Sequence, residues 1–455
     1  MAAPAVSRDT PSVNQSWAAG RSHGQDPDDG SDAIDVVLVG AGGAGLAVLH
    51  ALAHRDLTIG LPRPLRVVVV DPVADTDTAS RHRTWCFWAA GEVTVAPAVH
   101  ASWQHVRVSD DTRDLVLDLD PYRYHLVRSD DLAALVAEQV DRAPRLQVER
   151  VVAPAEQVVS CGDHAHVEVA GRSFRAGLVL DSRPVRPSAR GSVFWWQHFR
   201  GWTLPAGSLP ERRHPGPVAS LMDFRTAQPD AGLSFGYLLP LPDGRALAEY
   251  TEFSPTRLDD AGYDHALRGY LDLLGVAHDV VPDHVETGAI PMTDGTFTRR
   301  AGARVVRIGT AGGATRGSTG YTFAAMLRDG AAVADLVAGG VLDRPGPVHL
   351  PPSYPARHRW MDGIQLQALD AGRIDGPTFF TDLFDRRPAG QVLRFLDGTT
   401  DLAEDLGIMA ASPTLPMSWT AMHDGLARVR RSLGRGRGET VPAVPVATTV
   451  RTPSR

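Results

Sequence analysis

The hydrophobic and polar positions of this chain predict alternating strands and helices from residue 34 onward. An apolar run, "IDVVLV" at 34–39, leads into a glycine-rich turn and then into an Ala- and Leu-rich stretch. A second apolar run, "LRVVVVDP", ends with Asp71. This order predicts a strand, a glycine turn, a helix and a second strand that ends on an acid.

Gly40, Gly42 and Gly45 have the G-x-G-x-x-G spacing of a dinucleotide-binding turn. Such glycines let the backbone approach a pyrophosphate, which binds at the N-terminus of the helix. Asp71 then stands where it would hydrogen-bond the ribose hydroxyls. The alternative is a glycine-rich turn in another kind of α/β protein, and the motif alone does not separate NAD from FAD.

The later apolar runs favour FAD, because they do not continue as regular strand–helix units. "YHLVRSDDLAALVAEQV" at 124–140 ends in a helical pattern, and "AGLVLDSRP" at 177–185 predicts a strand that ends at Asp181. Residues 81–123 show few strand or helix periods. Arg128 suits a phosphate contact to the cofactor, with a surface arginine as the alternative.

A second glycine-rich loop follows the strand predicted at the start of 303–323 and precedes the helical stretch "TFAAMLRDGAAVADLV". We assign Gly309, Gly312, Gly313 and Thr315 to this loop. A second phosphate-approaching loop so late in the chain predicts a flavoprotein of the hydroxylase–reductase type, with a split FAD domain and an inserted substrate domain. Many such flavoproteins have Gly-Asp here, whereas Thr310 follows Gly309 in this chain.

The predicted fold class is α/β (α+β). It combines a Rossmann-like FAD-binding domain of the hydroxylase/reductase type, an inserted antiparallel β-sheet substrate domain and a C-terminal helical region. The expected ranges are a disordered tail (1–33), the first part of the FAD domain (34–190), the substrate sheet (191–290), the second part of the FAD domain (291–345), the helical region (346–435) and a disordered tail (436–455).

A β-hairpin is predicted where "LSFGYL" and "RALAEYTEFS" flank Pro-Asp-Gly. Alternation places Glu249 and Thr251 on one mostly apolar face, with Tyr250 and Glu252 on the other. Burial would raise the pKa of the Glu249 carboxyl and keep it protonated, as a general acid requires. The alternative is a structural Glu249 paired with an arginine.

The amino-acid composition argues against several kinds of reactive site and binding surface. The 455 residues contain two cysteines and no lysine, so a disulfide framework, a cysteine-based metal site and lysine chemistry are not expected. The 17 histidines show no zinc spacing, so we predict no metal site. A net charge of −7 argues against a nucleic-acid surface. No apolar stretch approaches the roughly 18 residues of a spanning helix, and the few cysteines suit a reducing cytoplasm.

The chain resembles the lycopene β-cyclases of the bacterial type over about residues 34–425. The stretches that carry the resemblance occur in the family's order and include "FGYLLPLPDGRALAEYTEFS", and the most unusual of them are "RTWCFW", "QHFRGW" and "STGYTF". The resemblance implies closure of the ψ-ends of lycopene into β-ionone rings. The implied cofactor is reduced FAD, with NAD(P)H as electron source, and there is no net redox change.

The resemblance also implies the catalytic residues. Glu249 matches the family's glutamate in its Glu-x-Thr-type motif, and Thr251 stands beside it. Trp196 and His198 belong to an aromatic cluster at 195–202 that we expect to line an apolar tunnel around a cation, with ordinary core packing as the alternative.

Three further residues each have more than one interpretation. Asp223 and Arg225 could pair or could border the pocket. Glu286 could orient the flavin loop or serve as a structural cap.

Lycopene and related carotenoids are the implied partners, together with other enzymes of the carotenoid pathway. Because lycopene dissolves in bilayers, we expect a cytoplasmic enzyme held peripherally on the inner face of the cell membrane. The basic stretch at 425–438 could attract anionic lipids, with a frayed tail as the alternative. The competing functions are an FAD-dependent hydroxylase or prenyl reductase on the same fold, and a carotenoid- or flavin-binding protein without activity.

Overall fold

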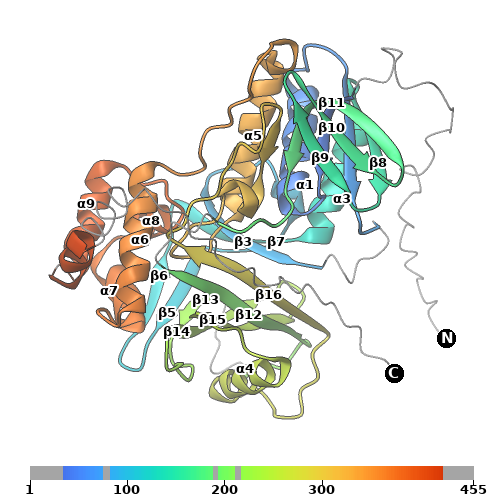
Figure 1. Ribbon diagram of the computed structural model, residues 1–455. Helices are drawn as coiled ribbons and strands as arrows, with labels where there is room; N and C mark the ends of the chain where they lie inside the picture. The colour runs from blue at the N-terminus through green and yellow to red at the C-terminus, as the bar shows by residue number, and fades with distance from the viewer. Residues whose placement is uncertain (1–33, 75–81, 188–192, 211–216, 414, 424–455) are drawn as a thin grey trace, which may run out of the picture.

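The computed structural model describes residues 34–74, 82–187, 193–210, 217–413 and 415–423. Within these ranges the strands form two seven-stranded sheets and one three-stranded sheet (Figure 1). The predicted tails at 1–33 and 436–455 and the basic stretch at 425–438 lie outside the described residues.

The first sheet has a parallel centre in the order β8-β2-β1-β11, extended by β10 and β9, and β17 also pairs with β11. Val36 and Leu38 of β1 pack into one core and Val37 and Val39 into another, so this strand is buried on both faces. The bounds are β1 (Ile34–Val39), β2 (Leu65–Asp71), β8 (Leu146–Val152), β9 (Gln157–Cys161), β10 (His164–Val169), β11 (Arg172–Asp181) and β17 (Val305–Arg307).

Three helices pack against this sheet: α1 (Gly43–Thr58), α3 (Ser129–Arg142) and α5 (Phe323–Ala338). Helix α1 contacts both α3 and α5, although α5 comes about 280 residues later in the chain. The second part of the nucleotide-binding fold therefore returns to complete the first, as a split domain requires.

The second sheet has the order β16-β12-β15-β14-β13-β5-β6. Helix α4 (Asp260–Leu274) covers one face, with Tyr270 and Leu271 packed against Ala248 and Tyr250. The opposite face lies toward the first sheet and the C-terminal helices (Figure 1). The bounds are β5 (His105–Ser109), β6 (Asp114–Asp118), β12 (Phe194–Leu204), β13 (Val218–Asp223), β14 (Leu233–Pro240), β15 (Ala246–Ser254) and β16 (His284–Thr293).

A three-stranded sheet joins the two larger ones: β3 (Thr84–Ala90), β7 (Tyr122–Arg128) and β4 (Val99–Trp103). Strand β3 carries the unusual "TWCFW" run. Phe87 packs into the core around α1 and α5, together with Trp85, whereas Trp88 packs into the core above the second sheet, together with Cys86. Because successive side chains of a strand point to opposite faces, this one short strand packs into two hydrophobic cores.

The C-terminal helices cover the outer part of the second sheet: α6 (Ala356–Asp370), α7 (Gly376–Arg386), α8 (Ala389–Leu396) and α9 (Leu402–Ala411). Phe380 of α7 stacks on Phe224 with ring centroids 6.1 Å apart. The Trp195 indole donates to Asp370 of α6 over 2.9 Å. These contacts bury the sheet face that bears Glu249.

The predicted fold class is confirmed: a Rossmann-type parallel sheet is combined with an antiparallel sheet and a helical C-terminal region. Sheet membership differs from the expected ranges at two points. Strands β5 and β6 belong to the second sheet although they precede residue 190, and β16 of the same sheet runs to Thr293, past residue 290. Residues 81–123 also contain more strands than their pattern predicts. Strand β6, for example, keeps three of its five residues exposed and so has little apolar periodicity.

Candidate active site between the two sheets

Four residues form one row across the second sheet. Tyr237 of β14 pairs with Glu249 of β15, Glu249 pairs with Gly201 of β12, and Gly201 pairs with Glu286 of β16. Side chains in one such row point to the same face of a sheet. Two carboxylates and a phenol are therefore aimed at the interior between the two large sheets.

Glu249 is a half-buried acid with one close hydrogen-bond donor. The Thr251 hydroxyl donates to its Oε1 over 2.6 Å, and Thr251 itself is fully buried. Desolvation by burial raises the pKa of Glu249 to about 8, and the nearby Glu286 carboxylate adds to the rise. Glu249 therefore carries its proton at neutral pH, and no arginine pairs with it in the described part of the chain.

Glu286 is more deeply buried and better supplied with donors. Its Oε1 accepts the Thr84 hydroxyl over 2.5 Å, and its Oε2 accepts the Thr84 backbone N–H over 3.2 Å. Burial raises the pKa of Glu286, while the Thr84 hydrogen bonds oppose the rise. Because two donors stabilise an ionised carboxylate better than one, Glu286 is the member of the pair suited to carry the charge.

Gly201 keeps the space between these two acids open. A Cβ at this position would lie 3.1 Å from Leu247 Cδ1, 3.2 Å from Glu286 Cγ and 3.4 Å from Glu286 Oε1. A larger residue would therefore require the side chains of Leu247 and Glu286 to shift by a few tenths of an ångström.

Aromatic residues from three segments surround this row of acids. Trp88 of β3 meets Tyr321 edge-on at a centroid distance of 4.6 Å, and the Tyr321 hydroxyl lies 3.5 Å from that of Tyr237. Tyr124 of β7 stacks beside Trp88 at 6.3 Å. Burial raises the pKa of all three tyrosines, so each keeps its proton. A small pocket lined by Trp88, Tyr321 and their neighbours opens here.

Cys86 lies on β3 between Thr84 and Trp88 and lines the same pocket as Trp88 and Tyr321. Burial raises the pKa of its thiol to about 12, and the two glutamates add to the rise. The thiol is therefore neutral and acts as an apolar wall rather than as a nucleophile. The site as a whole offers a neutral acid, a second carboxylate and π-rich walls, which suits protonation of an apolar substrate and stabilisation of a cation.

The predicted catalytic residues fall on two different faces of the sheet. Thr251 lies beside Glu249, as expected from alternation. Trp196 and His198 lie on the opposite face, because Gly201 shares the face of Glu249 and even-numbered positions of β12 point away from it. His198 bonds Tyr263 of α4 over 2.8 Å and Ser254 over 2.9 Å, so the structure does not bring it to Glu249.

Trp196 is half-buried on that second face, with the Arg257 guanidinium 5.4 Å from its ring centroid. Two residues of the predicted aromatic cluster, Trp195 and Phe199, share the face of Glu249. The Phe199 ring lies over Gly288, where an added Cβ would come within 2.4 Å of it. The aromatic cluster is thus divided between a core around α4 and the site.

The first glycine turn has the geometry that a dinucleotide requires. Gly40 has φ +101°, which suits glycine, and a Cβ at Gly45 would come within 2.2 Å of the Gly40 carbonyl oxygen. A Cβ at Gly42 would meet no atom within 4 Å. Gly42 precedes α1 without a side-chain cap, so the helix N-terminus faces open space, and the turn fits a bound pyrophosphate.

Other predicted cofactor residues already have protein partners. Asp71 accepts backbone N–H groups from Ala41 over 2.6 Å and from Val73 over 2.8 Å, so it orders the glycine turn. Two further predicted residues are held in bidentate ion pairs with close neighbours: Arg128 with Asp131 and Asp181 with Arg183. Their predicted contacts to a cofactor remain predictions.

The second glycine loop links the two halves of the site. Gly309 and Gly313 have positive φ, and a Cβ at Gly309 would lie 2.9 Å from Ala44 in the first turn of α1. Gly312 packs against the Arg307 carbonyl, and the Thr315 hydroxyl bonds that of Thr310 over 2.9 Å. The same loop then continues to Tyr321, which faces Glu249.

Sequence reasoning did not assign several residues that the structure brings together here. They are Thr84, Cys86, Trp88, Tyr124, Gly201, Tyr237 and Tyr321. The alternation of "RTWCFW" was a usable signal, because it separates Trp85 and Phe87 from Cys86 and Trp88. Asp223 and Arg225, whose role was open, form a bidentate ion pair away from Glu249.

Solved structures show the same fold at low sequence identity. One is a p-nitrophenol 4-monooxygenase from Pseudomonas putida, with TM-score 0.53 and 14% identity over 86% of this chain and 98% of that one. A flavoprotein/dehydrogenase from Cytophaga hutchinsonii has TM-score 0.56 and 11% identity over 86% and 100%. A geranylgeranyl bacteriochlorophyll reductase-like protein from Thermoplasma acidophilum has TM-score 0.55 and 12% identity over 85% and 98%.

Comparison of sequences gives a more specific result than comparison of folds. A lycopene beta-cyclase from Paracoccus sp. (strain N81106 / MBIC 01143) is 28% identical over 409 residues, which is 84% of this chain and 95% of that protein. The model of the family described as "Lycopene cyclase protein" matches residues 35–422. The chain belongs to the lycopene cyclase family.

Proposed function

We propose that this protein is a lycopene β-cyclase, which converts the ψ-end groups of lycopene into β-ionone rings by way of γ-carotene to β-carotene. Membership of the lycopene cyclase family and the likeness to a lycopene beta-cyclase support the substrate class. The observation that carries the mechanism is Glu249, a neutral acid among aromatic rings, with a pKa raised to about 8 by burial.

In the proposed reaction Glu249 donates its proton to the terminal double bond of the polyene. A tertiary carbocation forms, the neighbouring double bond attacks it, and the six-membered ring closes. A proton then leaves the carbon beside the new cationic centre and returns to the Glu249 carboxylate. Bonds and protons balance, so the product is an isomer of the substrate and the acid is regenerated.

The other residues of the site stabilise the cation and orient the acid. The ring faces of Trp88, Tyr237 and Tyr321 attract a positive charge and present no strong nucleophile to trap it. Thr251 holds the Glu249 carboxyl by its hydrogen bond. Glu286, held by Thr84, raises the pKa of Glu249 and places negative charge near the cation.

FAD is the proposed cofactor, because the glycine turn fits a pyrophosphate and the similar folds include a flavoprotein. Gly40, Gly42, Gly45 and the N-terminus of α1 would hold the pyrophosphate, and the loop with Gly309, Gly312, Gly313 and Thr315 would lie against the flavin. When bound, reduced FAD would supply negative charge that stabilises a carbocation. NAD(P)H is the proposed source of its electrons.

An FAD-dependent hydroxylase or prenyl reductase is the competing function. It is favoured by the fold, which this chain shares with a monooxygenase and with a reductase-like protein. The two functions differ in the mass of the product. A cyclase leaves the mass of the substrate unchanged, whereas the alternatives add oxygen or hydrogen and consume reductant with each turnover.

We also propose peripheral contact with the inner face of the cell membrane, where a carotenoid is dissolved. Helix α9 exposes Leu402, Leu406 and Met409, which recur at helical spacing and are 68%, 65% and 43% exposed. A following helix at 415–423 exposes Leu415, Trp419 and Met422 by 84%, 53% and 51%. Such apolar stripes suit insertion into the boundary of a bilayer.

The residues that follow these stripes and the bilayer-soluble substrate both favour a membrane surface as their partner. Residues 425–438, "GLARVRRSLGRGRG", follow directly and carry five arginines, which complement anionic headgroups. Within the described ranges no helix combines the length and the hydrophobicity needed to cross a bilayer.

Expression in a lycopene-accumulating bacterium tests the proposed function. We expect lycopene to be replaced by β-carotene, identified by chromatography and mass. An unchanged lycopene pool in cells that contain folded, flavin-loaded protein would contradict it.

A further inference from the structure

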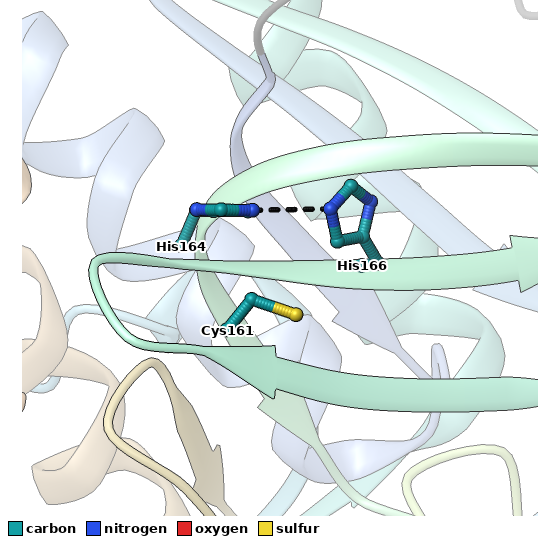
Figure 2. A group of neighbouring side chains, drawn as sticks. All are labelled: Cys161, His164 and His166. Atoms are coloured by element: carbon teal, nitrogen blue, oxygen red, sulfur yellow. Dashed lines mark hydrogen bonds between the residues drawn. The ribbon is translucent and has the colours of Figure 1, made fainter.

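The hairpin of β9 and β10 brings three metal-ligating side chains together at the edge of the first sheet. Cys161 ends β9, and His164 opposite it begins β10. His166 follows two residues later and so shares the strand face of His164. Figure 2 shows the three side chains next to one another on one face of the hairpin.

The donor atoms are already close. Nε2 of His164 lies 3.0 Å from Nε2 of His166, and one ring nitrogen of each histidine lies within 4.8 Å of the Cys161 sulfur. In a tetrahedral zinc site with ordinary bond lengths, ligand atoms are about 3.3–3.6 Å apart. The two nitrogens are near that separation, and the sulfur needs to move inward by roughly 1 Å. Cys161 is exposed, so rotation of its side chain is unhindered and an ion has access.

A fourth residue orients the first histidine. Asp163 Oδ1 lies 2.7 Å from Nδ1 of His164, so the carboxylate accepts a hydrogen bond from this ring nitrogen. A carboxylate on one ring nitrogen fixes the proton there and leaves the lone pair on the other. The free lone pair of His164 is thereby directed at His166, which is the outer-sphere arrangement typical of metal-bound histidine.

We propose that Cys161, His164 and His166 bind a zinc ion, with solvent at the fourth position. Two neutral imidazoles and a thiolate are ligands of borderline softness, which suit Zn²⁺ rather than Mg²⁺ or Ca²⁺. Binding removes the thiol proton of Cys161, which passes to solvent. Arg175 is the register partner of His166 on the neighbouring strand β11, so one positive charge shares the strand face of the proposed site.

This site is separate from the proposed catalysis. It lies on the first sheet, whereas Glu249 lies on the second. A bound ion would tie the end of β9 to β10 across the Gly162-Asp163 turn, so its role is to stabilise the hairpin. The sequence prediction of no metal site overlooked the spacing Cys-x-x-His-x-His in "CGDHAH", which strand pairing brings into contact.

Zinc content and cobalt spectroscopy of the untagged, reduced full-length protein test the proposal. We expect one Zn²⁺ per chain after dialysis, and with Co²⁺ a thiolate charge-transfer band together with tetrahedral d–d bands. Cys161→Ser should abolish the charge-transfer band, and His166→Gln should abolish stable binding. Asp163→Asn, a change at a positioning residue, should weaken binding by about 10- to 100-fold.

His278→Gln is the matched control, because His278 is an exposed histidine on another part of the chain. Its metal content should equal that of the wild-type protein. A wild-type protein that shows no thiolate band with Co²⁺ would overturn the proposal, and so would equal zinc binding in the Cys161 and His166 variants. Zinc should also raise the Tm of the wild-type protein and leave that of His166→Gln unchanged.

Discussion

Glu249 and Glu286 flank Gly201 on the two strands that pair with β12, so a half-buried acid and a buried acid lie on one face of the sheet on either side of a glycine. Neither acid has an arginine partner in the described part of the chain. Burial raises the pKa of both, and the Glu286 carboxylate further disfavours ionisation of Glu249. The pair therefore retains a proton where isolated glutamates would have lost theirs.

The pH dependence of activity should report this pair. If Glu249 must be protonated, activity is retained below a pKa of about 8 and falls as the pH rises through it. Glu286→Gln removes the Coulombic part of the rise but not the desolvation, so the basic limb should move to lower pH and stay above 4.5. Measurement of the reaction rate against pH for the wild-type protein and for Glu286→Gln checks this. If the fall in activity at high pH occurs at the same pH in both proteins, the two acids are not coupled.

The free energy of unfolding should also depend on pH, because of the proton that Glu249 holds. The pKa of Glu249 is higher in the folded state than the ordinary 4.5, so the folded protein holds a proton that the unfolded chain releases. The free energy of unfolding should therefore fall between pH 4.5 and about 8, by at most about 1.4 kcal/mol per pH unit. Glu249→Gln should flatten this slope in urea unfolding.

Gly201→Ala should disturb the gap between the acids. The new methyl group would contact Glu286 at 3.2–3.4 Å and Leu247 at 3.1 Å, which should cost about 1–3 kcal/mol of stability. The displaced carboxyl should lower kcat by about 10- to 100-fold.

Gly269→Ala is the matched control for this change, because a Cβ in that part of α4 meets no atom within 4 Å. It should raise stability by about 0.5–1 kcal/mol and leave kcat unchanged. Equal kcat values in the two variants would contradict the proposed role of the gap.

Gly42 and Gly45 should respond differently to alanine. At Gly42 the added methyl group meets open space, so the flavin-free protein should keep its Tm while flavin content falls. At Gly45 the methyl group would overlap the Gly40 carbonyl, so both Tm and flavin content should fall. Flavin absorbance and thermal unfolding measure the two effects. Full flavin content in Gly42→Ala would exclude the first glycine turn as the pyrophosphate site.

The exposed apolar stripes should govern vesicle binding. Leu406→Asp combined with Trp419→Asp should reduce co-sedimentation with anionic vesicles, because both changes place charge on the inserting surface. Ile59→Asp is the control, since Ile59 is 77% exposed on the first domain. The same reduction in all variants, or in none, would contradict membrane contact through α9 and 415–423.

The predictability of the fold and of the site differs for physical reasons. The glycine turn, the strand that ends at Asp71 and the hairpin that carries Glu249 are local patterns, and the structure has each of them. The face of the sheet on which each side chain of β12 lies depends on the register of β12 with β15. The local pattern therefore groups Trp196 and His198 with Glu249, although both lie on the face that α4 covers. Tyr321 and Cys86 reach the site only through long-range packing, which no local pattern contains.

The central claim, proton-initiated ring closure by Glu249, is tested most directly in D₂O. Flavin-loaded protein in excess over lycopene should give β-carotene of unchanged mass in H₂O and heavier by one deuterium per ring in D₂O, because the added proton comes from the exchangeable acid. Glu249→Gln should keep flavin and slow ring closure by roughly 10²- to 10⁴-fold. A product that gains oxygen or two hydrogens, or full activity in Glu249→Gln, would contradict the account.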